Sequence, residues 1–148
     1  MSATEGGRRD LAAMVAPLAR ELIAAEEPVL AAHRVSMWGY IVLGALAEQP
    51  VRTQAALAQA IRADKSRIIS VLDELQQAGL IQRQPDPADR RVHQLSLTPA
   101  GDKLRLSVQS GIRRNEERLL AHLPDADRAA FLRSLQALDK LYRARLAE

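Results

Sequence analysis

The stretch from residue 51 to residue 101 constrains the fold most, because its pattern of apolar residues changes there from a helical period to that of strands. Thr53 is a favourable N-cap for a helix over residues 54–61, and Asp64 for a second helix over residues 65–78. The residues between these two helices leave room only for a tight turn. The sequence therefore predicts two helices that pack against each other here.

A β-hairpin is predicted directly after the second helix, which Gly79 ends. Leu80-Ile81 begins its first strand, and Leu95 and Leu97 alternate with polar residues on the returning strand. The segment QPDPADRRVH lies between the strands. Its two prolines exclude a helix and its length excludes a two-residue turn, so we expect it to project as an extended loop.

The second helix has an apolar side and a polar side. About 100° per residue gathers its large apolar residues into one stripe. These are Ile68, Leu72 and Leu75, with Val71 beside them. Ser66 and Ser70 then lie on the opposite side, with Arg67 on the flank. Short hydroxyl side chains and a cation near the N-terminal end are what a recognition helix presents to the major groove. An ordinary solvated helix face is the alternative.

The projecting loop carries Arg83, Arg90 and Arg91, and a cationic hairpin beside two packed helices is typical of a winged helix-turn-helix. Asp89 lies two residues from Arg91, so its carboxylate can orient the guanidinium through a charge-assisted hydrogen bond before DNA is bound. The negative potential of a narrow minor groove attracts such an arginine. The alternative is a surface ion pair that contributes about 0–1 kcal/mol and has no function.

Composition excludes several classes of protein. The 148 residues are 47% hydrophobic but only 3% aromatic, so the core must be built from aliphatic residues, which favours helices. The net charge of +3 suits a polyanionic partner, as it suits many proteins without one. There is no cysteine, which excludes disulfides and thiolate metal sites. Short apolar runs and a polar N-terminus lead us to expect a soluble, cytoplasmic protein.

Two helices are predicted before the winged unit. Apolar residues at helical spacing indicate a first helix from about Asp10, which either ends before Pro28 or continues, kinked, to about His33. Ser36 is predicted to cap a second helix that stops at Gln49-Pro50. A short extended link, Val51-Arg52, leads from there to Thr53.

Two further helices are predicted after the hairpin. Thr98 is expected to cap and Pro99 to open a helix that runs to about Leu123. Pro124 breaks it, and Asp125 leads into a last helix whose apolar residues recur at helical spacing. These long amphipathic helices lie outside the compact unit, so their apolar stripes need a partner. A second copy of the chain is the simplest one, and an intramolecular bundle in a monomer is the alternative.

Several motifs in the middle third resemble the MarR family of transcriptional regulators, in the right order along the chain. They are Leu72-Asp73-Glu74-Leu75, Gly79-Leu80-Ile81, Asp89-Arg90-Arg91 and Leu97-Thr98-Pro99-Ala100-Gly101. The resemblance implies a homodimer in which the terminal helices interlock and two winged units bind a pseudo-palindrome. Two-fold symmetry then predicts half-sites about one helical turn apart.

The resemblance also implies a crevice between the dimer helices and the winged unit, in which small aromatic or lipophilic acids bind. The residues near this junction are His33, Arg34, Met37, Trp38 and Tyr40. Met37 and Trp38 are equally well explained as core residues. Cysteine-based peroxide sensing, found in some relatives, is not possible here.

We therefore expect a mostly α fold with a small β-hairpin, in a single domain over residues 1–148. Residues 36–98 would form the winged helix-turn-helix, and residues 10–33 and 99–147 the dimerisation helices. The expected function is a sequence-specific transcriptional regulator, a repressor more often than an activator, that binds double-stranded DNA as a homodimer and is relieved by a small ligand.

Each predicted contact has a role. Ser66, Arg67 and Ser70 would meet base edges, with Lys65 and the Thr53-Gln54 helix start on phosphates. The wing residues are predicted to bind the minor groove and the DNA backbone. Arg91, oriented by Asp89, would enter the minor groove, and Arg90 would contact the DNA backbone.

Other functions find little support in the chain. A winged-helix module that binds proteins instead of DNA is the alternative. No nucleophile motif, phosphate loop or paired carboxylates appear, so we expect neither an enzyme nor a cofactor. His33, His93 and His122 are scattered, so we expect no metal site.

Overall fold

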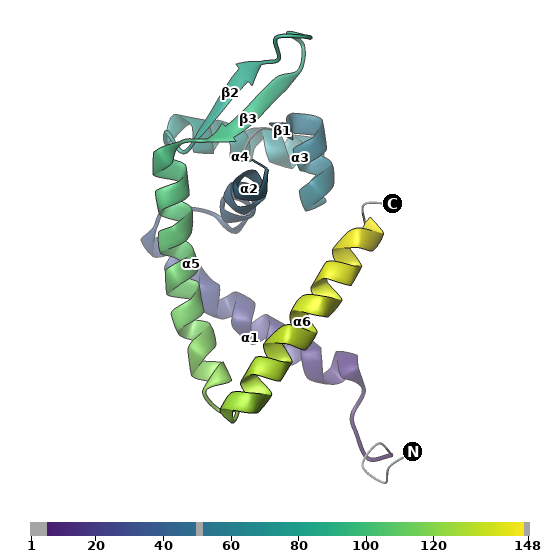
Figure 1. The fold of residues 1–148 in the computed structure, drawn as a ribbon. Helices are drawn as coiled ribbons and strands as arrows, with labels where there is room; N and C mark the ends of the chain where they lie inside the picture. The colour runs from purple at the N-terminus through teal and green to yellow at the C-terminus, as the bar shows by residue number, and fades with distance from the viewer. Residues whose placement is uncertain (1–5, 50–51, 147–148) are drawn as a thin grey trace.

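The computed structural model describes residues 6–49 and 52–146. Within these ranges the chain forms six helices and a small sheet, and the sheet lies at one end of the molecule (Figure 1). In chain order the elements are α1 (Leu11–Ala32), α2 (Met37–Glu48), β1 (Arg52–Thr53), α3 (Gln54–Ile61), α4 (Lys65–Gln77), β2 (Ile81–Pro85), β3 (His93–Leu97), α5 (Pro99–Leu120) and α6 (Asp125–Leu146). The prediction of a mostly α fold with a winged helix-turn-helix is confirmed.

Four helices begin at the N-caps that the sequence predicts. In each case a side-chain oxygen accepts a hydrogen bond from the backbone N–H three residues later, at 2.7–3.1 Å. The capping residues are Ser36, Thr53, Asp64 and Thr98. Each bond satisfies a donor that the helix itself leaves without a partner, which is why these starts are readable from sequence.

The helix ends differ in detail from the sequence prediction. Of the two alternatives for the first helix, the longer one holds, because α1 continues through Pro28 to Ala32. α5 ends at Leu120, earlier than the predicted Leu123, and the N–H of Leu123 closes a tight turn onto the carbonyl of Leu120 at 3.0 Å. Pro50 and Val51, predicted to stop α2 and to form part of the link, lie outside the described residues.

The sheet has one strand more than the predicted hairpin. β2 and β3 pair antiparallel from Ile81 opposite Leu97 to Pro85 opposite His93, and β1 pairs on the other side of β3. Arg52 is extended, as predicted, but the prediction did not include its pairing in the sheet. Its backbone pairs with Leu95, which ties the start of α3 to the wing.

The main core lies between α2, α3, α4 and the sheet. Its fully buried aliphatic side chains come from all of these elements, and they include Leu43, Leu46, Leu57, Leu72, Ile81 and Leu95. A second cluster joins α1 to α5 through Leu30, Val108 and Ile112. The first cluster fixes α4 and the hairpin relative to each other, since each contributes side chains that the other covers.

Thr98 connects the end of α4 to the start of α5. Its hydroxyl donates to the carbonyl oxygen of Gly79 at 2.6 Å, and its N–H donates to the carbonyl oxygen of Leu80 at 3.1 Å. Gly79 has a φ of 74°, which favours glycine. Gly101 lies so close to Leu80 that a Cβ would be 2.0 Å from its carbonyl oxygen. The positive φ explains the glycine at position 79, and the close approach explains the glycine at position 101.

The ends of the chain leave apolar surface uncovered. α5 and α6 form the two arms of a V, and the hairpin projects at the far end of α5 (Figure 1). No residue of α6 within Asp125–Arg145 is fully buried, and its exposed large apolar residues are Phe131, Leu135, Leu138, Leu141 and Tyr142. α1 likewise exposes Leu11, Val15, Leu18 and Ile23.

No single helix among the described residues is both long and apolar enough to cross a membrane. The consecutive helices α1 and α2, which meet at an 88° bend, satisfy such a test of length and composition only as a pair.

Candidate nucleic-acid interface

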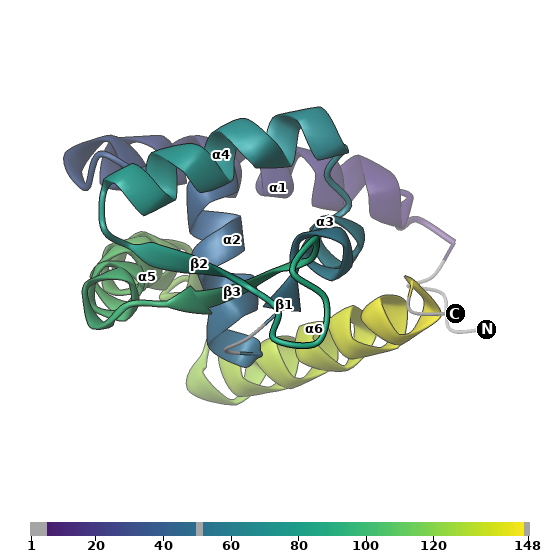
Figure 2. The same ribbon diagram turned by 90° about the horizontal axis from the view of Figure 1, so that it is seen from above.

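The polar face of α4 is exposed on the outside of the molecule, and α4 and α6 lie on opposite sides of the sheet in Figure 2. The hydroxyl of Ser66 donates to Asp64 Oδ1 at 2.8 Å, and that of Ser70 donates to the carbonyl oxygen of Arg67 at 3.2 Å. Both serines are exposed, as their predicted role requires. Their oxygens keep lone pairs that can accept from a base.

Asp64 holds the first turn of α4 together. The backbone N–H of Arg67 and the hydroxyl of Ser66 both donate to its carboxylate, and they lower its pKa below the ordinary value. The charged form therefore persists at neutral pH and favours the helix N-terminus, where the backbone N–H groups point.

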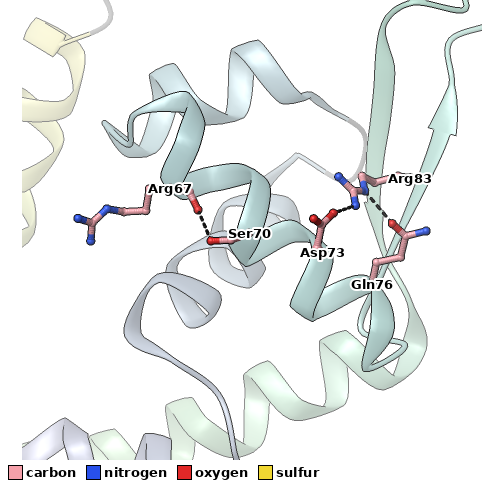
Figure 3. A network of polar contacts seen from close by, with 5 residues as sticks. All are labelled: Arg67, Ser70, Asp73, Gln76 and Arg83. Atoms are coloured by element: carbon pink, nitrogen blue, oxygen red, sulfur yellow. Dashed lines mark hydrogen bonds and ion pairs between the residues drawn. The ribbon is translucent and has the colours of Figure 1, made fainter.

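Arg67 lies to one side of this face. Its guanidinium carbon is 5.5 Å from the centre of the Trp38 ring on α2, a cation–π distance. Figure 3 shows its side chain directed away from the hairpin. In this conformation Arg67 contacts α2, so it must turn by side-chain rotation to reach a base edge.

The wing tip, residues 86–92, is ordered by two aspartates. The Nε of Arg91 donates to Asp89 Oδ1 at 3.2 Å, the pairing that the sequence predicts. The Arg91 side chain is nevertheless 92% exposed, so its cationic end remains free to meet a ligand. Arg90 is exposed beside it.

Asp86 was not anticipated from the sequence as a wing residue. Its carboxylate accepts from the backbone N–H of Ala88 and from Gln94 Nε2, both at 2.8 Å. These bonds lower the pKa of Asp86, the Ala88 bond most. The turn-forming pair Asp86-Pro87 is the signal that could have indicated this role, since aspartate often bonds the backbone two residues on.

Arg83 lies in β2 and not on the tip, so its predicted position is wrong. β2 extends to Pro85, and the side chain of Arg83 turns back to α4. There its Nε donates to Gln76 Oε1 at 2.7 Å, and the guanidinium also pairs with Asp73 (Figure 3). Arg83 therefore connects the hairpin to α4.

A cleft of about 440 Å³ lies between the start of α3, the outer side of α4 and the wing. Four of the predicted contact residues line it, from three separate parts of the chain: Thr53, Gln54, Lys65 and Arg91. Ile69 and His93 line it too, and neither was predicted as a contact. The lining residues include two cations and no carboxylate, so the cleft suits a phosphate backbone.

The five residues predicted to line a ligand crevice do not share one cavity among the residues described. Trp38 packs on the main core, and Met37 and Tyr40 on the cluster between α1 and α5. The ring nitrogens of His33 lie 2.8 Å from the Val29 carbonyl oxygen and 2.9 Å from Ser107 Oγ. Arg34 is exposed at a φ of 55°.

Tyr40 alone of the five faces a wide hollow of about 690 Å³ between α2, α3, α5 and α6. Burial most of all raises the pKa of its hydroxyl. Arg105 and Tyr142 are among the other residues that line this hollow. Across residues 6–49 and 52–146, no three histidine or acidic side chains are grouped as metal ligands would be.

Residues 38–92, which include α3, α4, β2 and the wing tip, match the model of the MarR family. A putative transcriptional regulatory protein for the hcr operon of Thauera aromatica is 35% identical over 99 residues, which are 67% of this chain and 60% of that relative. The solved structure titled MarR has a TM-score of 0.81 at 22% identity, over 94% of this chain and 95% of that one. Residues 38–92 of the chain belong to the MarR family.

Another MarR-like structure is the transcriptional repressor CouR bound to a 23-mer DNA duplex. It is 25% identical, with a TM-score of 0.74 over 88% of this chain and 92% of CouR. The chain spans about 60% of the length of the Thauera relative and 48% of the regulator HosA of Escherichia coli O111:H-. Members of the MarR family are transcriptional regulators and not enzymes, as the sequence predicts for this chain.

Proposed function

We propose that this MarR-family protein is a sequence-specific DNA-binding repressor that acts as a homodimer on a pseudo-palindromic operator. The cleft between α3, α4 and the wing carries this proposal, because it gathers Thr53, Gln54, Lys65 and Arg91 on one surface without a carboxylate. CouR, similar in fold over most of both chains, is bound to duplex DNA. The location that we propose for it is the cytoplasm.

In this proposal the contacts divide by chemistry. Lys65 and the backbone at the start of α3 neutralise or bind phosphates, while Ser66 and Ser70 meet base edges in the major groove. Arg67 joins them after leaving Trp38, which costs about 0.5–1 kcal/mol of cation–π energy.

The wing would bind the adjacent minor groove. Arg91 enters it with its orientation held by Asp89, and Arg90 remains on the backbone. Because the Asp89 bond restricts Arg91 before DNA arrives, less side-chain entropy is lost on binding.

The homodimer rests on the uncovered apolar faces of α1 and α6. Leu11 is 65% exposed and Leu138 is 64% exposed, and neighbouring apolar residues extend both faces. Each large aliphatic side chain that a second copy covers would stabilise the dimer by about 1.5–3 kcal/mol before association costs. Two-fold symmetry then places two copies of α4 about one DNA turn apart.

Selection of binding sites from randomised duplexes tests the DNA-binding part. The native chain should enrich one pseudo-palindromic sequence, and Arg91→Ala should bind it with an affinity lower by about 1–3 kcal/mol. Arg118→Ala is the matched control, since Arg118 is exposed at the end of α5 distant from the wing. If Arg91→Ala bound with full affinity, the proposed contact of Arg91 with the minor groove would be wrong. No enrichment of any duplex would favour the protein-binding alternative.

Sedimentation equilibrium tests the homodimer. The native chain should have twice the monomer mass, and Leu138→Glu should shift it toward monomer because a carboxylate then replaces an apolar contact. Lys140→Glu adds the same group on another side of α6 and should leave the dimer intact. A native chain that sediments as a monomer at tens of micromolar would contradict the proposal.

We further propose that a small aromatic acid relieves DNA binding from the hollow beside Tyr40. Its aromatic walls include Tyr142, and Arg105 supplies a cation for a carboxylate, although it already pairs with Asp102. Calorimetric titration with benzoate and hydroxybenzoates should give heats that Arg105→Gln weakens. Binding that Arg105→Gln leaves unchanged would place the effector elsewhere.

A further inference from the structure

Ile69 is unusual among the apolar residues of α4. The other large ones, Ile68, Val71, Leu72 and Leu75, are buried in the core, whereas Ile69 is 48% exposed. Among the described residues of α3, α4 and the wing, it is the one exposed large hydrophobic side chain. The core does not require an isoleucine at this position, so its apolar side chain calls for another explanation.

The position of Ile69 points to duplex DNA as its ligand. Along the helix Ile69 is about 60° from Ser66, on the side that faces the wing. It lines the cleft together with Lys65, Gln54 and Arg91, so cationic and polar groups surround it. A protein partner or a second copy would meet these charges as well, but a polyanion complements them and neutralises them.

The base edges of the major groove offer one apolar group that the Ile69 side chain could contact. The major groove presents donors and acceptors, and in addition the 5-methyl group of thymine, which is read by apolar contact. We propose that Ile69 is a specificity-determining residue that contacts the 5-methyl group of one thymine in each half-site. This inference rests on the proposed DNA-binding function and goes beyond it, because it assigns a base preference to a residue.

The experiment removes only the methyl group. In the duplex chosen by selection, each thymine is replaced in turn by deoxyuridine, and affinities are measured by fluorescence anisotropy at one salt concentration. One replacement per half-site should weaken the native chain about three- to tenfold, the effect of one buried methyl group and its packing. 5-Bromodeoxyuridine at the same place should restore affinity, since bromine is similar in size to methyl.

Protein variants assign the contact to Ile69. Ile69→Ala should bind the thymine and deoxyuridine duplexes equally, whereas Leu106→Ala, which shortens an equally exposed apolar side chain of α5, should keep the native preference. Both variants should melt near the native temperature, since both side chains are exposed.

The possible results separate this inference from the proposed function. Specific binding without any thymine-to-deoxyuridine effect would overturn the inference and leave the DNA-binding function intact. A methyl effect that Ile69→Ala retains would also overturn it, because another residue then makes the contact. Failure to bind any duplex would overturn the proposed function, and the inference with it.

Discussion

Arg83 in β2 donates a hydrogen bond from its Nε to Oε1 of Gln76 in α4, at 2.7 Å. Its guanidinium also pairs with Asp73, and its side chain is only 18% exposed. The wing and the recognition helix are thus held together by polar contacts outside the main core. In the proposed complex α4 and the wing fit neighbouring grooves of the DNA, so a fixed relative position would favour binding.

Replacement of Arg83 by methionine should therefore affect DNA binding more than folding. We expect a loss of about 1 kcal/mol in unfolding free energy, because Asp73 is half exposed and such pairs are weak. Operator affinity should fall about three- to tenfold through the looser wing. Urea denaturation and anisotropy measure the two effects. Arg83→Lys should lose as much operator affinity as Arg83→Met. Native affinity in both variants would show that Arg83 does not position the wing for binding.

Trp38 offers a direct signal for movement of Arg67. Trp38 is the single tryptophan of the chain, and the guanidinium of Arg67 lies over its ring. If Arg67 leaves the ring to contact DNA, the fluorescence of Trp38 should change on addition of the selected duplex. Arg67→Ala should show the altered fluorescence already in the free protein and little further change with DNA. An unchanged native spectrum at saturating duplex would mean that Arg67 stays on Trp38.

Gly101 should tolerate no side chain. A Cβ there would lie 2.0 Å from the backbone carbonyl oxygen of Leu80, and no flexible side chain can move aside. Gly101→Ala should therefore destabilise the fold by about 1–3 kcal/mol, as overpacking does. Gly44→Ala is the control, since a Cβ there meets nothing within 4 Å, and it should stabilise α2 by about 0.5–1 kcal/mol. Equal melting temperatures for the two variants would contradict the close approach.

Asp86 should make stability depend on acid pH. Hydrogen bonds from Ala88 and Gln94 lower its pKa below the ordinary value of 3.8, so its contribution is fully present above that value. The contribution is lost as the pH falls through the lowered pKa. The melting temperatures of the native chain and Asp86→Ala should differ by a constant amount from about pH 8 to 5 and converge below about pH 4. If the difference in melting temperature instead grew as the pH falls, the pKa of Asp86 would be raised by folding and not lowered.

Local chemistry explains what could be predicted from the sequence. The caps at Ser36, Thr53, Asp64 and Thr98 depend on atoms within three residues, so each helix start was readable. The Asp89–Arg91 pair is likewise local, and the structure contains it as predicted. Proline in the α1 sequence left two alternatives, because a proline can end a helix or continue it with a kink.

Contacts between distant residues account for what was missed. β1 has two residues, too few to show an alternating pattern, and its pairing depends on β3 about forty residues later along the chain. Arg83 could not be assigned to Gln76, because nothing local indicates which face of β2 meets α4. Ile69 was overlooked since an apolar residue beside an apolar stripe is usually part of the core.

The salt dependence of affinity tests most directly whether α4 and the wing of a dimer bind duplex DNA. For the selected duplex, the logarithm of the association constant should fall linearly with the logarithm of salt concentration, by about 0.9 per phosphate neutralised. Lys65→Ala removes one cation from each copy and should reduce this slope by about 2 per dimer. A slope near zero, or the same slope for both proteins, would contradict the account.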